Sequence, residues 1–197
     1  MQRVIVVLLL AFMLVSSPLF AQRTQSTTFE NKIGRENEAI ARRAGIWDVT
    51  ETVWASPSSA PVVTKWVAER RMIGEFLEEV LEPTLGAAPA QFQRIDYLGY
   101  HRTEGRWKYV SMDTRASVGM MPAASTDRGD LTSIHLTFEP FAIPVEGSKV
   151  GQLLVMQEVI TQTDIDHDRK DQYFNLADGS GVLWLKHKYE YVRRRTK

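Results

Sequence analysis

The chain has 197 residues with 24 basic and 24 acidic side chains, so its formal net charge is zero. The longest basic run, Arg193 to Arg195, is short and is typical of a solvated strand end. Because phosphate binding requires clustered Lys and Arg side chains, the sequence predicts no nucleic-acid partner. The absence of cysteine excludes disulfides, thiolate chemistry and a lipid-modified N-terminal cysteine.

The first residues are typical of an export signal. A short basic start precedes an unbroken apolar run from Val4 to Val15, which polar residues and Pro18 then end. The run is shorter than the roughly 20 apolar residues that a membrane-spanning helix needs, so an uncleaved anchor is the less favoured alternative. We therefore expect residues 1–21 to be a signal peptide cleaved after Ala21. The mature protein would then have no membrane span and would be periplasmic or secreted.

Two further segments follow the expected signal. Residues 22–28 are polar and are expected to form a disordered linker, and residues 29–197 are expected to form one domain. Over residues 29–44 apolar side chains recur at helical spacing, which predicts an amphipathic helix of three or four turns. Gly34 weakens the middle of this predicted helix, and Gly45 is placed where a helix usually stops.

After Gly45 the apolar pattern falls to a period of two, which indicates β-strands. About ten short segments of this kind are separated by turn residues such as Thr103–Gly105 and Asp178–Gly181. The segment Met72–Leu81 suits a helix or a strand, and we interpret it as one strand. Many short strands at regular spacing predict an antiparallel sandwich or barrel.

The last and longest predicted strand, Val182–Val192, has two distinct faces. The face that we expect to point inward carries Leu183, Leu185, His187, Tyr189, Tyr191 and Arg193. The opposite face, with Trp184, Lys186, Lys188 and Glu190, is expected to meet solvent. An inward His187 could be a core histidine satisfied by a neighbouring group, or a ligand contact or proton-transfer group.

The same alternation adds candidates from two other strands. One face carries Trp107, Tyr109, Ser111 and Asp113, and another carries Trp47, Val49, Glu51 and Val53. If these faces point inward, Glu51 and Asp113 are interior carboxylates. Burial makes a carboxylate costly unless it bonds to a Tyr, His or Arg, so the alternative is a hydrated position near a barrel mouth.

Familiar catalytic and cofactor motifs are missing from the sequence. It has no G-x-S-x-G elbow, no phosphate-binding glycine loop and no dinucleotide fingerprint. The acidic run Asp164–Asp168 lacks the glycine and the closing glutamate of an EF-hand, which favours a solvated turn. We expect no metal and no cofactor, although a haem needs just one axial histidine and His187 leaves that alternative open.

A family resemblance joins several of these elements. Gly45-Ile46-Trp47, between the predicted helix and the first strand, resembles the G-x-W signature of lipocalins and related calycin barrels. Further segments, Gly74 to Glu79, Leu98 to Tyr100 and Gly105 to Met121, resemble in their order a bacterial family of uncharacterised proteins with a lipocalin-like fold. The resemblance implies a mainly β, single antiparallel up-and-down barrel of about ten strands, with the helix closing one end.

The resemblance also implies a structural trio. In calycin barrels the G-x-W tryptophan packs at the closed end against an arginine from the final strand. Here Gly45 and Trp47 match the signature, and Arg193 shares the inward parity of Tyr189 and Tyr191. We therefore expect Arg193 to stack on Trp47.

Barrels of this strand number can enclose one small ligand, so the favoured function is binding of a small, largely apolar molecule by an exported protein. The expected ligand-binding residues are Leu185, His187, Tyr189, Tyr191, Trp107, Tyr109 and Glu51.

Two alternatives to a binding protein stay open. One is an isomerase, lyase or hydrolase in which His187 is the acid or base and Tyr189, Tyr109 or Asp113 orients it. The other is an envelope interaction protein whose barrel is filled.

Overall fold

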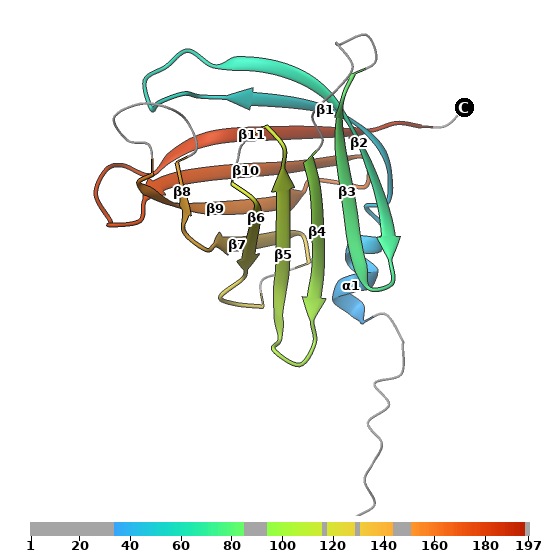
Figure 1. Ribbon diagram of the computed structural model, residues 1–197. Coiled ribbons are helices and arrows are strands. Elements are labelled where there is room, and N and C mark those ends of the chain that lie inside the picture. The colour runs from blue at the N-terminus through green and yellow to red at the C-terminus, as the bar shows by residue number, and fades with distance from the viewer. Residues whose placement is uncertain (1–33, 85–93, 116–117, 129–130, 144–150, 196–197) are drawn as a thin grey trace, which may run out of the picture. The chain divides into compact units, whose positions relative to one another are not determined.

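The computed structural model describes residues 34–84, 94–115, 118–128, 131–143 and 151–195. These residues form one helix, α1 (Arg35–Ala41), and a sheet of eleven strands (Figure 1). The strands are β1 (Gly45–Val53), β2 (Val62–Ile73), β3 (Phe76–Pro83), β4 (Arg94–His101), β5 (Arg106–Asp113), β6 (Met120–Ala124), β7 (Ser133–Phe138), β8 (Phe141–Ala142), β9 (Leu153–Gln162), β10 (His167–Leu176) and β11 (Trp184–Arg193). The predicted signal peptide and linker lie outside the described residues.

Ten of the strands close into an antiparallel barrel, and β8 lies outside that circle. Strands β1 to β7 pair in chain order, β7 pairs with β9, and β9, β10 and β11 lead back to β1. The short strand β8 pairs with the beginning of β9. Most strands therefore pair with their neighbours in the chain, which is the up-and-down arrangement. The predicted barrel of about ten strands is confirmed.

The helix is shorter than the sequence predicted. In the described part of the chain, α1 has seven residues and begins after Gly34, which is its N-cap. The backbone of Gly34 is extended (φ −71°, ψ 163°), so a position expected in mid-helix is instead its boundary. The buried side chains of Asn37 and Ile40 attach α1 to the barrel. The Oδ1 atom of Asn37 accepts a 2.8 Å hydrogen bond from the backbone N–H of Tyr100 in β4.

The predicted strand Met72–Leu81 is two strands. Strand β2 ends at Ile73 and β3 begins at Phe76, because Gly74 adopts a positive φ of 61° and reverses the chain. The predicted turn at Thr103–Gly105 is confirmed between β4 and β5, with Gly105 at φ 69°.

A β-bulge changes the two faces of β11. Two consecutive residues of β10, Gln172 and Tyr173, pair with the residues on either side of Lys186. An extra residue in one strand shifts the alternation of side chains beyond it. Trp184 and Lys186 therefore line an interior cavity, whereas the sequence predicted that both face solvent. From His187 to Arg193 the predicted alternation holds, with Tyr189 and Tyr191 buried.

Candidate functional site

The cavity has a volume of about 700 Å³ and lies at the end of the barrel where the β1–β2 and β10–β11 connections meet. Its wall is mostly apolar and includes Val118, Met121, Phe141, Leu154, Phe174 and Trp184. The ring of Phe174 is central to this wall, with centroids 5.9 Å from Phe141, 6.1 Å from Trp184 and 5.9 Å from His187. The predicted candidates His187 and Asp113 both line the cavity, and so does Lys186.

His187 is held by Glu51 of the neighbouring strand. The register of β1 with β11 places Glu51 opposite Tyr189, so both side chains point to the barrel interior. The Nδ1 atom of His187 lies 3.0 Å from Oε1 of Glu51. Because an ionised carboxylate only accepts hydrogen bonds, the proton is assigned to Nδ1. The Nε2 atom is then an acceptor that has no hydrogen-bond partner among the described residues.

Burial and charge set the ionisation of this pair. Burial alone would raise the pKa of Glu51, but the hydrogen bond from His187 and the charge of Arg115 together hold that pKa below its usual value. Burial lowers the pKa of His187, and this effect exceeds the opposing effect of the hydrogen bond to Glu51. Near neutral pH the pair therefore consists of an ionised Glu51 and a neutral His187.

Arg115 binds the two carboxylates at this site. Its Nη1 atom donates to Oε2 of Glu51 at 2.8 Å, and its Nη2 atom donates to Oδ2 of Asp113 at 2.8 Å. Trp66 donates from Nε1 to the same Glu51 oxygen at 2.8 Å, and Nη2 of Arg115 lies 3.3 Å from the hydroxyl of Tyr189. Sequence reasoning missed Arg115 and Trp66. It did predict that an interior Glu51 needs a Tyr, His or Arg partner, and the structure brings all three to this site.

The part of the barrel nearest α1 is filled by a network of buried charges. Its members come mainly from β2, β3, β4 and β10: Arg43, Arg70, Arg94, Lys170, Glu79, Asp96, Asp168 and Glu158. Glu79 is central, because it accepts from Nε of Arg70 at 2.6 Å, Nη2 of Arg94 at 3.0 Å and Nζ of Lys170 at 2.9 Å. Burial alone would raise the pKa of Glu79, but these cations hold it well below its usual value. The sequence reasoning did not anticipate this network.

Three of the predicted ligand-binding residues belong to this filled part or to the core. The hydroxyl of Tyr191 donates to Oε1 of Glu79 at 3.0 Å, and that of Tyr109 lies 3.4 Å from Nζ of Lys170. Trp107 is fully buried in the apolar core. Among the described residues, the cavity lining contains Trp184 and Lys186 in place of the predicted Leu185.

At the α1 end, Arg193 joins the helix to the barrel. Its guanidinium carbon lies 4.2 Å from the ring centroid of Trp47, which is the contact that the sequence predicts. Its Nη1 and Nη2 atoms donate to the carbonyls of Ala44 at 2.6 Å and Arg42 at 2.7 Å, just after α1. A Cβ atom on Gly45 would meet Nη1 of Arg193 at 2.8 Å, and Gly45 has a φ of 138°. Glycine at this position therefore leaves room for the arginine.

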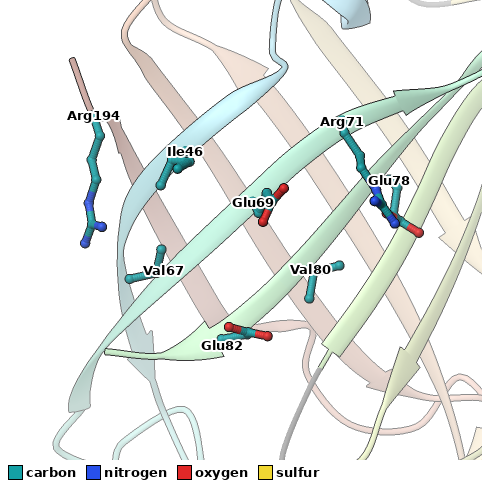
Figure 2. Close-up of a pocket in the computed structure, with 8 residues that line it drawn as sticks. All are labelled: Ile46, Val67, Glu69, Arg71, Glu78, Val80, Glu82 and Arg194. Atoms are coloured by element: carbon teal, nitrogen blue, oxygen red, sulfur yellow. The ribbon is translucent and has the colours of Figure 1, made fainter. Parts of the chain in front are cut away.

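A second hollow lies on the outer face of the barrel and has a volume of about 330 Å³ (Figure 2). Figure 2 shows Val67 and Val80 between charged side chains, with Arg71 and Glu78 pointing toward one another. Arg71 and Glu78 form an ion pair, and Arg194 pairs with Asp48 at 2.6 Å. Because these charges already have partners, the inner cavity is the better candidate for a ligand site.

Within the described ranges, no helix is long and apolar enough to cross a membrane. The same residues contain no cluster of three or more His, Asp or Glu side chains that could hold a metal ion.

Three comparisons place the chain among known proteins. The search of curated proteins gives no match. Among solved structures, the chain is similar to the crystal structure of Rv2717c from M. tuberculosis, with a TM-score of 0.50 and 13% sequence identity over 83% of this chain and 100% of that one. A likeness at this identity shows a shared barrel fold. The model of the family described as "Protein of unknown function (DUF1579)" matches residues 32–191, and the chain therefore belongs to that family.

Proposed function

We propose that the protein binds a small, largely apolar molecule in the barrel cavity. The observation that carries this proposal is a cavity of about 700 Å³ with a mostly apolar wall. Ligand sites for small molecules typically measure about 300–1,000 Å³ and combine apolar walls with a few polar groups. The cavity also argues against the alternative of an interaction protein with a filled barrel.

The energetics favour an apolar ligand body. Burial of apolar surface contributes roughly 25 cal/mol per Å², so each 100 Å² that a ligand buries is worth about 2.5 kcal/mol before the costs of binding. The rings of Phe141, Phe174 and Trp184 provide such surface on one side of the cavity. Beside Phe174, His187 provides a polar contact through Nε2, which has no hydrogen-bond partner among the described residues.

The resemblance of the sequence to calycin barrels supports the same proposal. The stack of Arg193 on Trp47 beside Gly45 is the arrangement that the calycin resemblance implies. Barrels of this kind commonly enclose one small ligand between a closed end and an open end.

Filling the cavity tests the proposal directly. Met121 is 9% exposed and lines the cavity, whereas its neighbour Met120 is 71% exposed on the outer face. We expect Met121→Trp to abolish binding of the neutral fluorescent probe N-phenyl-1-naphthylamine, and Met120→Trp to leave it unchanged. Equal binding by wild type and Met121→Trp would overturn the proposal. If the proposal holds, native mass spectrometry of protein purified from its own host would identify a retained ligand.

Catalysis in the same cavity is the second candidate, and the His187–Glu51 pair favours it. A neutral imidazole held through Nδ1 can accept a proton at Nε2, which is how a general base acts. Glu51 would orient the ring and stabilise the imidazolium that forms. If the cavity is a binding or catalytic site, His187→Ala should alter ligand retention or turnover more than His167→Ala, whose histidine is exposed.

We also propose that the protein is exported after cleavage behind Ala21. The basic start and the apolar run from Val4 to Val15 support this proposal. The intact mass of the protein from the periplasm or medium tests it, because cleavage leaves a chain that begins at Gln22. A chain that retains Met1 in the membrane fraction would contradict it.

A further inference from the structure

The bulge in β11 brings a lysine to a mostly apolar cavity. Lys186 lies beside His187 and lines the cavity with Phe174 and Trp184. In regular alternation this side chain would lie on the solvent face with Lys188. The bulge therefore places the Lys186 side chain at the cavity, where the other wall residues are mainly apolar.

The acidic groups near Lys186 already have cationic partners. Asp113 and Glu51 both accept hydrogen bonds from Arg115, each at 2.8 Å. On the outer face, Lys188 pairs with Glu190 at 2.7 Å. In the described part of the chain, no carboxylate lies within ion-pair distance of Nζ of Lys186.

A half-buried ammonium group without a counter-ion is unfavourable. Burial lowers the pKa of Lys186, and no neighbouring acid opposes that effect. An anion in the cavity would supply the missing partner, because the charge-assisted hydrogen bonds of Lys with oxygen anions are the stronger ones.

We propose that the ligand of this cavity is an amphipathic anion whose charged group pairs with Lys186 and whose apolar body lies against Phe174 and Trp184. The proposal rests on the proposed binding function and specifies the chemical class of the ligand. Ligands of this class carry an oxygen anion, such as a carboxylate, at one end of an apolar chain or ring system.

Two ligands with the same ten-carbon chain, one with an anionic and one with a neutral head group, test the proposal. Decanoate and decanol are titrated against N-phenyl-1-naphthylamine bound to the mature chain, in wild type, Lys186→Met and Lys188→Met. Both substitutions keep an unbranched side chain that is one heavy atom shorter and remove one positive charge. Lys188, however, faces outward and is ion-paired. We expect the ratio of decanoate to decanol affinity to fall about tenfold in Lys186→Met, as for the loss of one partly buried ion pair. Lys188→Met should keep the wild-type ratio.

The outcomes separate the two levels of the proposal. If decanol displaces the probe and the ratio is the same in wild type and Lys186→Met, the preference for an anion is overturned and the binding function stands. An equal fall of the affinity ratio in Lys188→Met would also overturn the assignment of the anion to Lys186, because general surface charge would then explain the effect. If the probe binds but neither compound displaces it, the proposed ligand class is overturned and the binding function stands. If the probe does not bind the wild type, the binding function fails as well.

Discussion

The barrel interior has two parts that differ in what fills them. Near α1, buried charges such as Glu79, Arg70 and Lys170 bond to one another and leave little space. At the other end, an apolar wall surrounds a cavity of about 700 Å³. Buried apolar side chains such as Trp107 and Phe138 form a packed core as well, so apolar residues occur both in the filled interior and around the cavity. The difference shows that residue polarity alone does not indicate which part of this barrel is filled and which is hollow.

The two parts should also respond differently to substitution. Breaking a buried charge network leaves an uncompensated charge in a medium of low dielectric constant, which is costly. Removing a side chain from a wall that already borders empty space loses fewer contacts. The predictions below test this contrast.

The largest effect is expected at the centre of the charge network. Glu79→Gln keeps the shape of the side chain but leaves Arg70, Arg94 and Lys170 without their shared anion. We expect a loss of about 3–5 kcal/mol in the free energy of unfolding, measured with urea. The control Glu190→Gln removes an exposed carboxylate that pairs with Lys188 on the outer face, and it should cost at most about 1 kcal/mol. Equal losses in the two variants would mean that the buried network has no special role.

Trp47 is expected to give the next largest effect. Trp47→Ala removes a fully buried indole and should cost about 3–5 kcal/mol. The stack with Arg193 should account for only about 0.5–2 kcal/mol of coupling, because Arg70 also lies over this ring, at 4.8 Å. A double-mutant cycle with Arg193→Ala measures the coupling between the two side chains. A coupling energy indistinguishable from zero would show that the stack does not contribute to stability.

A smaller effect of opposite sign is expected at Glu158. Its Oε1 atom has no hydrogen-bond partner among the described residues, and burial raises its pKa. A raised folded-state pKa means that ionisation costs stability above the unfolded value of about 4.3, and that this cost disappears at lower pH. Glu158→Gln should therefore be more stable than wild type at pH 7, and the gain should shrink below about pH 4. The same substitution at Glu139, whose side chain is exposed, should change the free energy of unfolding little. A gain at Glu158 that does not depend on pH would exclude ionisation as its cause.

The smallest change in stability is expected at the cavity wall. Phe174 is only partly buried, so Phe174→Ala should cost about 1 kcal/mol while weakening binding of the neutral probe. In contrast, Phe138 is 2% exposed and packs on Tyr109, so Phe138→Ala should cost about 3–5 kcal/mol. Similar losses at the two phenylalanines would contradict the division of the interior into packed and hollow parts.

Several features of the site could be predicted because they depend on neighbours in the chain. Alternation along β1 correctly places Trp47, Val49 and Glu51 in the interior, and the same rule buries Tyr189 and Tyr191. Each of these positions depends on the period of a regular strand, which the residue types reveal. The contact between Trp47 and Arg193 is the one that the calycin resemblance implies, and parity selects Arg193 as the arginine.

The features that the sequence analysis did not predict depend on contacts between different strands. The bulge at Lys186 arises in the pairing of β11 with β10, so β11 alone does not reveal it. Arg115 reaches Glu51 across 64 residues of sequence, and Lys170 reaches Glu79 across 91. Inward polar residues such as Glu79 and Lys170 also conflict with a simple pattern of apolar interior and polar exterior. Their partners, which make burial tolerable, come from distant strands.

The sequence by itself therefore determined the class of fold, the order of most strands and the inward face of the regular ones. Local alternation and turn residues indicate many short antiparallel strands, and the resemblance to calycin barrels implies their closure and their order. Only the tertiary structure decided which part of the interior is filled and which is hollow, and which residues surround His187. Those outcomes depend on how side chains from different strands meet inside the closed barrel, because packing and charge pairing act through space and not along the chain.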